Sequence, residues 1–229
     1  MQFLSNKAAL MSRLRQRTKD DPMTTDAQFW NKIARRYAAN PVKDMSSYEQ
    51  TLERTGSYLH ADDSVLELGC GTATTALILA PQVTQYTATD IADEMIAIGR
   101  EKAADQGASN VELVTATSDD ARFSDGRRDA VLAFNLFHLV DDMDATLDMA
   151  HAALKPGGYL ISKTVCLGEA SFFIPLMVRA MQLVGKAPFV RFFKIAELEQ
   201  MIIAKDFDII ETGCYPAKPP SRFIVSRKR

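Results

Sequence analysis

The stretch from Val65 to Leu77 limits the possible folds more than any other part of the chain. It reads Val-Leu-Glu-Leu-Gly-Cys-Gly-Thr-Ala-Thr-Thr-Ala-Leu. Its first four residues predict a short buried strand, which two glycines interrupt, and Thr72 begins a predicted helix that runs to about Ala80. A strand, a Gly-x-Gly turn and a helix form the nucleotide-cradling unit of a doubly wound α/β sheet. Glycine lets the backbone turn tightly there and leaves room for a ligand.

An acidic residue follows this unit at the spacing that is typical of a ribose-binding carboxylate. Thr87 to Asp90 ends the next predicted strand, and Asp90 comes about twenty residues after Gly69. A carboxylate at the end of that strand can accept hydrogen bonds from both ribose hydroxyls of a nucleotide. The alternative is an ordinary turn with an acidic loop end. The order of strand, turn, helix and acid favours the nucleotide site.

The glycine pattern distinguishes between classes of nucleotide. A dinucleotide site would place a third glycine where Thr74 stands. The pattern Glu67-x-Gly69-x-Gly71-x-Ala73 instead resembles motif I of the class I S-adenosylmethionine-dependent methyltransferases, with Ala73 in place of the last glycine. A second likeness is the run Leu-Lys-Pro-Gly-Gly-x-Leu at residues 154–160. The resemblance covers roughly residues 29–228 and is closest to the ubiquinone/menaquinone-type, methyltransferase-11-like branch.

The resemblance implies a Rossmann-like α/β fold. Its doubly wound seven-stranded sheet would have the order 3-2-1-4-5-7-6, with strand 7 antiparallel and helices on both faces. The pattern of the sequence agrees, because strands alternate with helices until the last two strands, which should pair antiparallel. Predicted strands cover residues 65–68, 87–90, 111–115, 129–134, 159–163, 207–213 and 222–226, and predicted helices include 26–37, 48–59, 93–103, 144–154 and 195–205. Asp26 and Asp93 are expected as helix N-caps, and Lys155 to Gly158 as a turn.

The resemblance also implies a binding site for S-adenosyl-L-methionine. Gly69 and Gly71 would admit its methionine part, Glu67 would lie near the ammonium group, Asp90 would hold the ribose and Ile91 would face adenine. The full predicted set is Glu67, Gly69, Cys70, Gly71, Thr72, Asp90, Ile91, Thr117, Ser118 and Asn135. No metal ligand is predicted.

The adenine contact is an open point in this comparison. Related enzymes often carry Gly-Asp-Ala after strand three, and the alignment places Ala116-Thr117-Ser118 on that triplet. Either Thr117 or Ser118 hydrogen-bonds adenine, or Asp119 takes the place of the missing acid.

His138 is the candidate catalytic residue. It lies in the run Asn135-Leu136-Phe137-His138 after strand four, where it is the one side chain of the neighbourhood that ordinarily titrates near neutral pH. It would accept a proton from a hydroxyl or amine acceptor. The alternative is that it only caps or packs the loop, because methyl transfer often proceeds by proximity and desolvation.

The chain divides into a basic, flexible N-terminal extension (1–22) and a single methyltransferase domain (23–229). The extension carries no acid before Asp20, and an organelle transit peptide, a membrane-interface helix and a loose tail all fit its composition. Within the domain we expect an N-terminal helical lid (26–59), with Tyr37 as a lid residue, and an apolar cover insertion (164–193). A mostly helical stretch from Phe172 to Val184 would face an apolar acceptor, pack in the core or touch a membrane surface.

The composition of the chain limits its domain number, its partners and its compartment. The chain has 229 residues and a net charge of −2, so one domain is expected and no basic excess indicates nucleic acid. The three cysteines show no metal or Cys-x-x-Cys spacing, which fits a reducing, cytoplasmic setting, with organelle targeting by the basic N-terminus as the alternative. Nothing in the sequence indicates an oligomeric state.

The sequence therefore predicts an S-adenosylmethionine-dependent methyltransferase that acts on a small, apolar or lipid-like acceptor. One rival is a methyltransferase-like protein that binds the cofactor without turnover. A second rival, disfavoured by Thr74, is a nicotinamide-dependent oxidoreductase.

Overall fold

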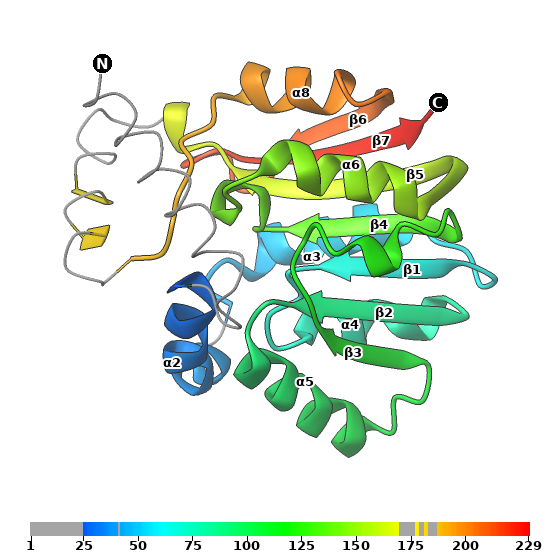
Figure 1. Ribbon diagram of the computed structural model, residues 1–229, viewed down its shortest axis with the longest axis vertical. Helices are drawn as coiled ribbons and strands as arrows, with labels where there is room; N and C mark the ends of the chain where they lie inside the picture. Colours follow the sequence, from blue (N-terminus) through cyan, green and yellow to red (C-terminus); the bar gives the residue numbers. More distant parts are fainter. Residues whose placement is uncertain (1–24, 41, 170–176, 179–180, 183–186) are drawn as a thin grey trace, which may run out of the picture.

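A seven-stranded sheet forms the centre of the molecule (Figure 1). The computed structural model describes residues 25–40, 42–169, 177–178, 181–182 and 187–229. The strand order is β3-β2-β1-β4-β5-β7-β6, and β7 runs antiparallel to both of its neighbours, which confirms the predicted fold. The strands are β1 (Ser64–Leu68), β2 (Gln85–Asp90), β3 (Val111–Thr115), β4 (Arg128–Phe134), β5 (Leu154–Val165), β6 (Phe207–Cys214) and β7 (Ser221–Lys228).

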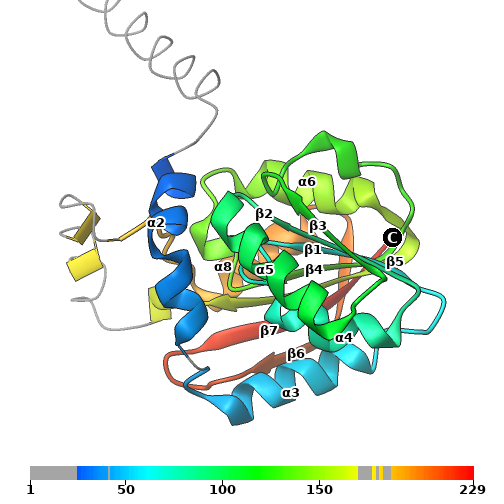
Figure 2. The same ribbon diagram turned by 90° about the horizontal axis from the view of Figure 1, so that it is seen from below.

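Helices cover both faces of the sheet (Figure 2). They are α2 (Thr25–Ala39), α3 (Met45–Gly56), α4 (Thr74–Leu79), α5 (Asp93–Gln106), α6 (Met143–Ala153) and α8 (Ile195–Ile203). One face packs against α6 and α8, and the other against α3, α4 and α5. Among the described residues, no helix combines the length and the apolar character that crossing a membrane requires.

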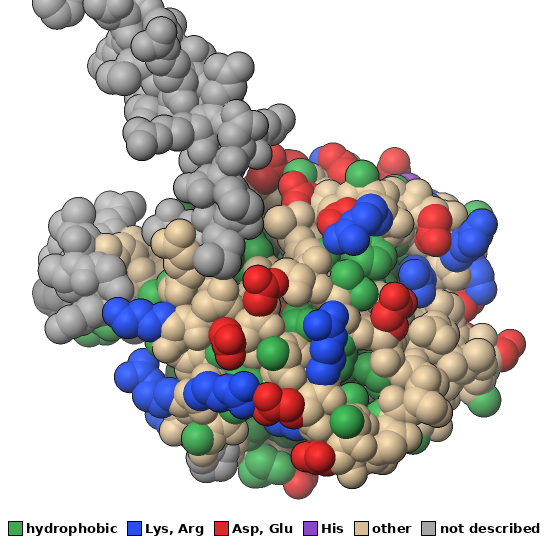
Figure 3. Space-filling model, turned by 60° about the horizontal axis from the view of Figure 1, so that its bottom comes forward, with side chains coloured by type: hydrophobic (Ala, Val, Ile, Leu, Met, Phe, Trp, Pro, Cys, Tyr) green, Lys and Arg blue, Asp and Glu red, His purple; other side chains and the backbone are tan. Residues whose placement is uncertain are grey.

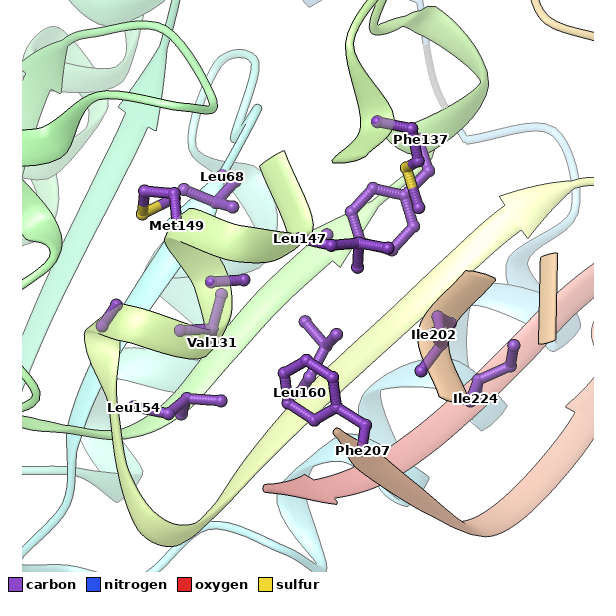
Figure 4. Packing of buried hydrophobic residues seen from close by; sticks show 14 of the residues in the cluster. Leu68, Val131, Phe137, Leu147, Met149, Leu154, Leu160, Ile202, Phe207 and Ile224 are labelled. Carbon is purple, nitrogen blue, oxygen red and sulfur yellow. The ribbon is translucent and has the colours of Figure 1, made fainter. Parts of the chain in front are cut away.

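The central strands are apolar on both sides because both faces are covered. In β4, Val131 and Ala133 belong to the core under α6 and α8, whereas Ala130 and Leu132 belong to the opposite core. Figure 4 shows the first of these cores, in which Leu147 of α6 and Ile202 of α8 lie over the sheet. This double burial holds the carboxyl ends of β1, β2, β4 and β5 in fixed positions.

Several predicted element boundaries and caps are wrong, and each has a local cause. Helix α4 begins at Thr74 rather than Thr72, because Ala73 adopts a left-handed conformation with φ +58°. Helix α5 has Ala92, not Asp93, at its N-cap, and the carboxylate of Asp90 accepts the hydrogen bond from the Ala92 N–H. Strand β5 already begins at Leu154, so residues 155–158 belong to the strand as an irregularity in its pairing with β4 rather than to a separate turn.

The lid helices also differ from expectation at their ends. Asp26 lies in the first turn of α2 and accepts a hydrogen bond from the backbone N–H of Phe189, so it is not the N-cap. Helix α3 starts at Met45, three residues before its predicted start, because Asp44 caps it through the Ser47 N–H.

Helix α2 lies beside the carboxyl ends of the parallel strands (Figure 1). A bidentate ion pair from Arg35 to Glu101 of α5, at 2.7 and 2.9 Å, fastens it to the body of the fold. The proposed N-terminal extension (1–22) lies outside the described residues, and so do residues 170–176, 179–180 and 183–186 of the cover insertion (164–193). On the face drawn in Figure 3, the described acidic and basic side chains are interspersed.

Candidate functional site

A large cavity of about 1460 Å³ opens at the carboxyl ends of the parallel strands. Its walls come from β1, β2, β4 and β5, from the loops that follow them and from the lid helices α2 and α3. Every site residue predicted from the sequence lines this cavity: Glu67, Gly69, Cys70, Gly71, Thr72, Asp90, Ile91, Thr117, Ser118, Asn135 and His138. The structure thus brings the set together, while the role of each residue stays a prediction.

The turn from Gly69 to Gly71 depends on its glycines for two different reasons. Both residues have a positive φ, +65° and +55°, which residues other than glycine rarely adopt. A Cβ on Gly69 would lie 2.7 Å from Cδ1 of Leu136, so the protein itself fills that space. Among the described residues, a Cβ on Gly71 would meet only Cε1 of Tyr37, at 3.8 Å, so the space beside Gly71 remains open for a ligand.

Ala73, which replaces the last glycine of the motif, fits because the residue that faces it on α5 is a glycine, Gly99. A Cβ on Gly99 of α5 would lie 3.0 Å from the Cβ of Ala73. The absence of a side chain at Gly99 therefore makes room for the methyl group of Ala73.

Asp90 connects the turn to the next helix. Its Oδ2 accepts a hydrogen bond from the Gly71 N–H and its Oδ1 one from the Ala92 N–H, both at 2.9 Å. Burial raises the pKa of this carboxyl group, and the backbone hydrogen bonds oppose that shift. Each carboxylate oxygen has a second lone pair, so Asp90 is able to accept hydrogen bonds from a vicinal diol as well.

Glu67 is the most buried acid of the site. Its side chain is 2% exposed and accepts a hydrogen bond from the Tyr86 hydroxyl at 2.8 Å. Burial, helped by the negative charge of Asp90, raises the pKa of Glu67 to about 7. Glu67 therefore gains or loses its proton close to neutral pH, and a bound cation beside it would favour the ionised form.

This shift predicts a pH-dependent stability. Between the ordinary pKa of 4.5 and about 7, the native state holds a proton on Glu67 that the unfolded chain has lost. Wild-type stability should therefore fall as pH rises through this window, by up to about 3 kcal/mol. Glu67→Gln keeps an acceptor for Tyr86 and has no proton to lose. In urea unfolding, the variant should gain stability over the wild type between pH 5 and pH 8, and an equal difference at both pH values would contradict the shift.

The loop after β3 leaves the adenine contact open. The Ser118 hydroxyl lies 2.8 Å from the Thr146 hydroxyl of α6 and is thus engaged within the protein. Thr117 and Asp119 are exposed at the cavity wall. Both remain available to an adenine amino group.

The loop after β4 carries Asn135 and His138. The backbone N–H of Asn135 donates to the Lys163 carbonyl at 2.7 Å, so a backbone contact of Asn135 with the cofactor would use its carbonyl group. Burial lowers the pKa of His138 to about 4, and its Nδ1 is buried without a hydrogen-bond partner among the described residues. The imidazole is therefore neutral at physiological pH and a weaker base than an exposed histidine.

Several cavity residues were not predicted from the sequence as site residues. Trp30 packs edge-on against Tyr37, with ring centroids 6.3 Å apart, and both line the cavity. The Tyr48 hydroxyl lies 3.1 Å from Thr75 Oγ1. Lys163 lines the cavity at the end of β5, although its side chain is buried. The sequence signal that could have identified Lys163 is a lysine near the end of an apolar strand. Lysine is seldom buried without a partner, so a lysine in such a strand indicates a candidate functional position.

Within the predicted cover from Phe172 to Val184, a helical period of 3.6 residues would put Phe173, Met177, Ala180, Met181 and Val184 on one stripe. Of these, Met177 and Met181 are 58% and 38% exposed. Neither is among the cavity-lining residues. The rest of that stripe lies outside the part of the chain that the structure describes.

Sequence comparisons match part of this chain to methyltransferases. Residues 65–158 match the family described as "Methyltransferase domain". A demethylmenaquinone methyltransferase of Listeria monocytogenes is 33% identical over 101 residues, which are 42% of this chain and 42% of the relative. The match thus spans about two fifths of the length of that curated relative.

Solved structures share the fold. A structure described as a putative methyltransferase from Bacillus halodurans has a TM-score of 0.67 at 17% identity, over 78% of this chain and 97% of the other. The [4+2]-cyclase SpnF has a TM-score of 0.65 at 16% identity, over 78% and 80% of the two chains. At such identities the likeness shows the fold and leaves the reaction to be argued from the site.

Proposed function

We propose that this chain is a class I S-adenosylmethionine-dependent methyltransferase and that it methylates a small, apolar or lipid-like acceptor. The observation that carries the proposal is the single cavity in which the Gly69–Gly71 turn, Asp90 and Glu67 meet at the carboxyl ends of β1 and β2. This is where ligands bind in doubly wound sheets.

The residues present fit the cofactor. The open space beside Gly71 admits its methionine end, and the free lone pairs of Asp90 accept hydrogen bonds from the ribose hydroxyls. Glu67 supplies a buried carboxyl group for the ammonium. When bound, S-adenosylmethionine supplies an activated methyl group together with its own leaving group. The remaining tasks of the protein are to align the acceptor and to exclude water.

The size and lining of the cavity support a second ligand beside the cofactor. At about 1460 Å³ it is larger than the roughly 300–1,000 Å³ that a typical small-molecule site occupies. Apolar side chains from separate segments are among the residues that line the cavity: Val42, Phe134, Leu136, Leu139, Val140, Val165 and Phe189. Such a lining favours an apolar acceptor, since burying one large apolar group contributes about 1.5–3 kcal/mol.

Within this proposal, His138 accepts the acceptor's proton. His138→Gln should lower kcat about 100-fold, the lower range for loss of a positioned base, while the Kd for S-adenosylhomocysteine stays unchanged. His60→Gln is the control, because the His60 side chain is 70% exposed and does not line the cavity. An unchanged kcat in His138→Gln would leave His138 with a packing role only.

The experiment that tests the function has two stages. Calorimetry should show binding of S-adenosylhomocysteine and none of NAD. Incubation of the protein and S-adenosylmethionine with small-molecule extracts should then yield a product heavier by one methylene unit, detected by mass spectrometry. Binding of NAD alone would overturn the cofactor assignment. Cofactor binding with no methylated product in extracts from the native host would favour a binding protein without turnover.

A further inference from the structure

The Lys163 side chain places a buried cation in the wall of the cavity. It is 8% exposed, and it lies near the carboxyl end of β5, next to Phe134 of β4 in the sheet register. Its Nζ donates a hydrogen bond to Thr51 Oγ1 of α3 at 3.0 Å. The Thr51 hydroxyl in turn donates to the Ser47 carbonyl at 2.7 Å, so its oxygen acts as an acceptor toward Lys163.

This arrangement leaves most of the ammonium group unsatisfied. An ammonium group has three donors, and Thr51 takes one of them. Among the residues that the structure describes, no carboxylate forms an ion pair with Lys163. The charge of Asp44 acts on it only from a distance, because the Asp44 carboxylate caps α3 through the Ser47 N–H. Burial lowers the pKa of Lys163, as expected for a cation held away from water without a counter-ion.

The position of Lys163 in the sheet separates it from Glu67 and Asp90, the two acids assigned to the cofactor. Val165 follows it on the same face of β5, and Pro216 and Pro219 of the β6–β7 connection line the same cavity together with Ser221 at the start of β7. Glu67 and Asp90 belong to β1 and β2, with β4 between β1 and β5. Lys163 therefore faces the part of the cavity that remains for the acceptor.

We propose that Lys163 binds an anionic oxygen of the acceptor, which is thus an apolar molecule with one acidic group, such as a carboxylate. This inference rests on the proposed function, because it places the acceptor beside the cofactor. The anion supplies the missing counter-ion and accepts the donors that Thr51 does not use. The hydrogen bonds so formed are charge-assisted, and they are stronger than those between neutral groups.

A purely structural role for Lys163 makes a different prediction. If Lys163 only fastens α3 to the sheet through Thr51, its replacement changes stability but not the preference between charged and neutral ligands. A matched pair of probes measures that preference directly. We choose 2-naphthoate and 2-naphthamide, which have nearly the same shape and differ in charge.

The experiment measures the Kd of both probes for the full chain saturated with S-adenosylhomocysteine. We expect the wild type to bind 2-naphthoate at least about tenfold more tightly than 2-naphthamide, and Lys163→Met to lose this preference. Lys163→Arg should retain part of it. Lys43→Met is the control, because Lys43 is an exposed lysine at the rim of the same cavity.

Each outcome bears on one proposal. No preference in the wild type, or an unchanged preference in a folded Lys163→Met variant, overturns the role of Lys163. Loss of the preference in Lys43→Met as well would overturn it too, since the preference would then not be specific to Lys163. Failure of the wild type to bind S-adenosylhomocysteine would instead contradict the proposed function, and the probe comparison is then made without it.

Discussion

Replacing Gly71 by valine should abolish measurable binding of S-adenosylhomocysteine. The residue has φ +55°, and a Cβ built on it has only Tyr37 Cε1 nearby, at 3.8 Å, so the added side chain projects into the open cavity. Its two methyl groups would occupy the space assigned to the methionine end of the cofactor. A β-branched residue at positive φ also strains the turn by about 1–3 kcal/mol. Together these effects should raise the Kd by at least about 100-fold, and titration calorimetry measures it.

Gly107 provides a matched control for the backbone strain. It ends α5 with φ +64°, and a Cβ at this position would have nothing within 4 Å. Gly107→Val should therefore lose a similar amount of stability and keep the affinity of the wild type. If Gly71→Val is folded and binds as Gly107→Val does, the assignment of the Gly69–Gly71 turn to the cofactor is wrong.

The sheet could be predicted from the sequence because its signals are local. Strand β3 was predicted with the same bounds that the structure has, and β1 to within one residue, since short apolar runs between turns define them. The strand order followed from the family resemblance together with the alternation of strands and helices. The helix starts were less accurate, because a cap is decided by tertiary contacts. Asp93 has a side chain typical of an N-cap, yet Ala92 occupies that position, and the Asp90 carboxylate accepts a hydrogen bond from the Ala92 N–H.

The candidate site was predictable where one segment carries it and not where distant segments meet. The Gly69–Gly71 turn and Asp90 belong to a single strand-turn-helix-strand unit, and they appear together in the cavity. The burial of Lys163 depends on Thr51, more than a hundred residues earlier in the chain. The pKa of His138 depends on the layers that cover its loop, whereas the sequence gives only the ordinary value near 6.5. Burial of a polar group is a property of packing, and pattern alone does not fix it.

Asp90 shows how one carboxylate serves the fold and the ligand together. From the sequence alone its loss should weaken binding and leave the fold intact. In the structure it also satisfies the N–H groups of Gly71 and Ala92, so its removal leaves two backbone donors for water to satisfy. The effect on stability and the effect on binding therefore have to be measured separately.

Asp90→Ala should lower the free energy of unfolding by about 1–3 kcal/mol, because two charge-assisted hydrogen bonds are lost and water reaches the site only in part. It should also raise the Kd for S-adenosylhomocysteine by about 10- to 100-fold, because the ribose hydroxyls lose a charged acceptor that contributes about 1.5–3 kcal/mol to binding. Asp90→Asn keeps one acceptor oxygen and should lie between alanine and wild type in both measurements.

Asp120→Ala separates the two effects. Asp120 also accepts a backbone hydrogen bond, from the Arg122 N–H at 2.9 Å, as the N-cap of a short 3-10 helix (Ala121–Phe123), but it does not line the cavity. Its loss should lower stability without changing affinity. Urea unfolding and calorimetry, both at a temperature where every variant is folded, give the two quantities. If Asp90→Ala loses stability but binds S-adenosylhomocysteine as tightly as the wild type, the carboxylate serves the turn alone. The ribose hydroxyls must then be bound by another group of the cavity, for which the exposed Asp119 of the β3 loop is one acidic candidate among the lining residues.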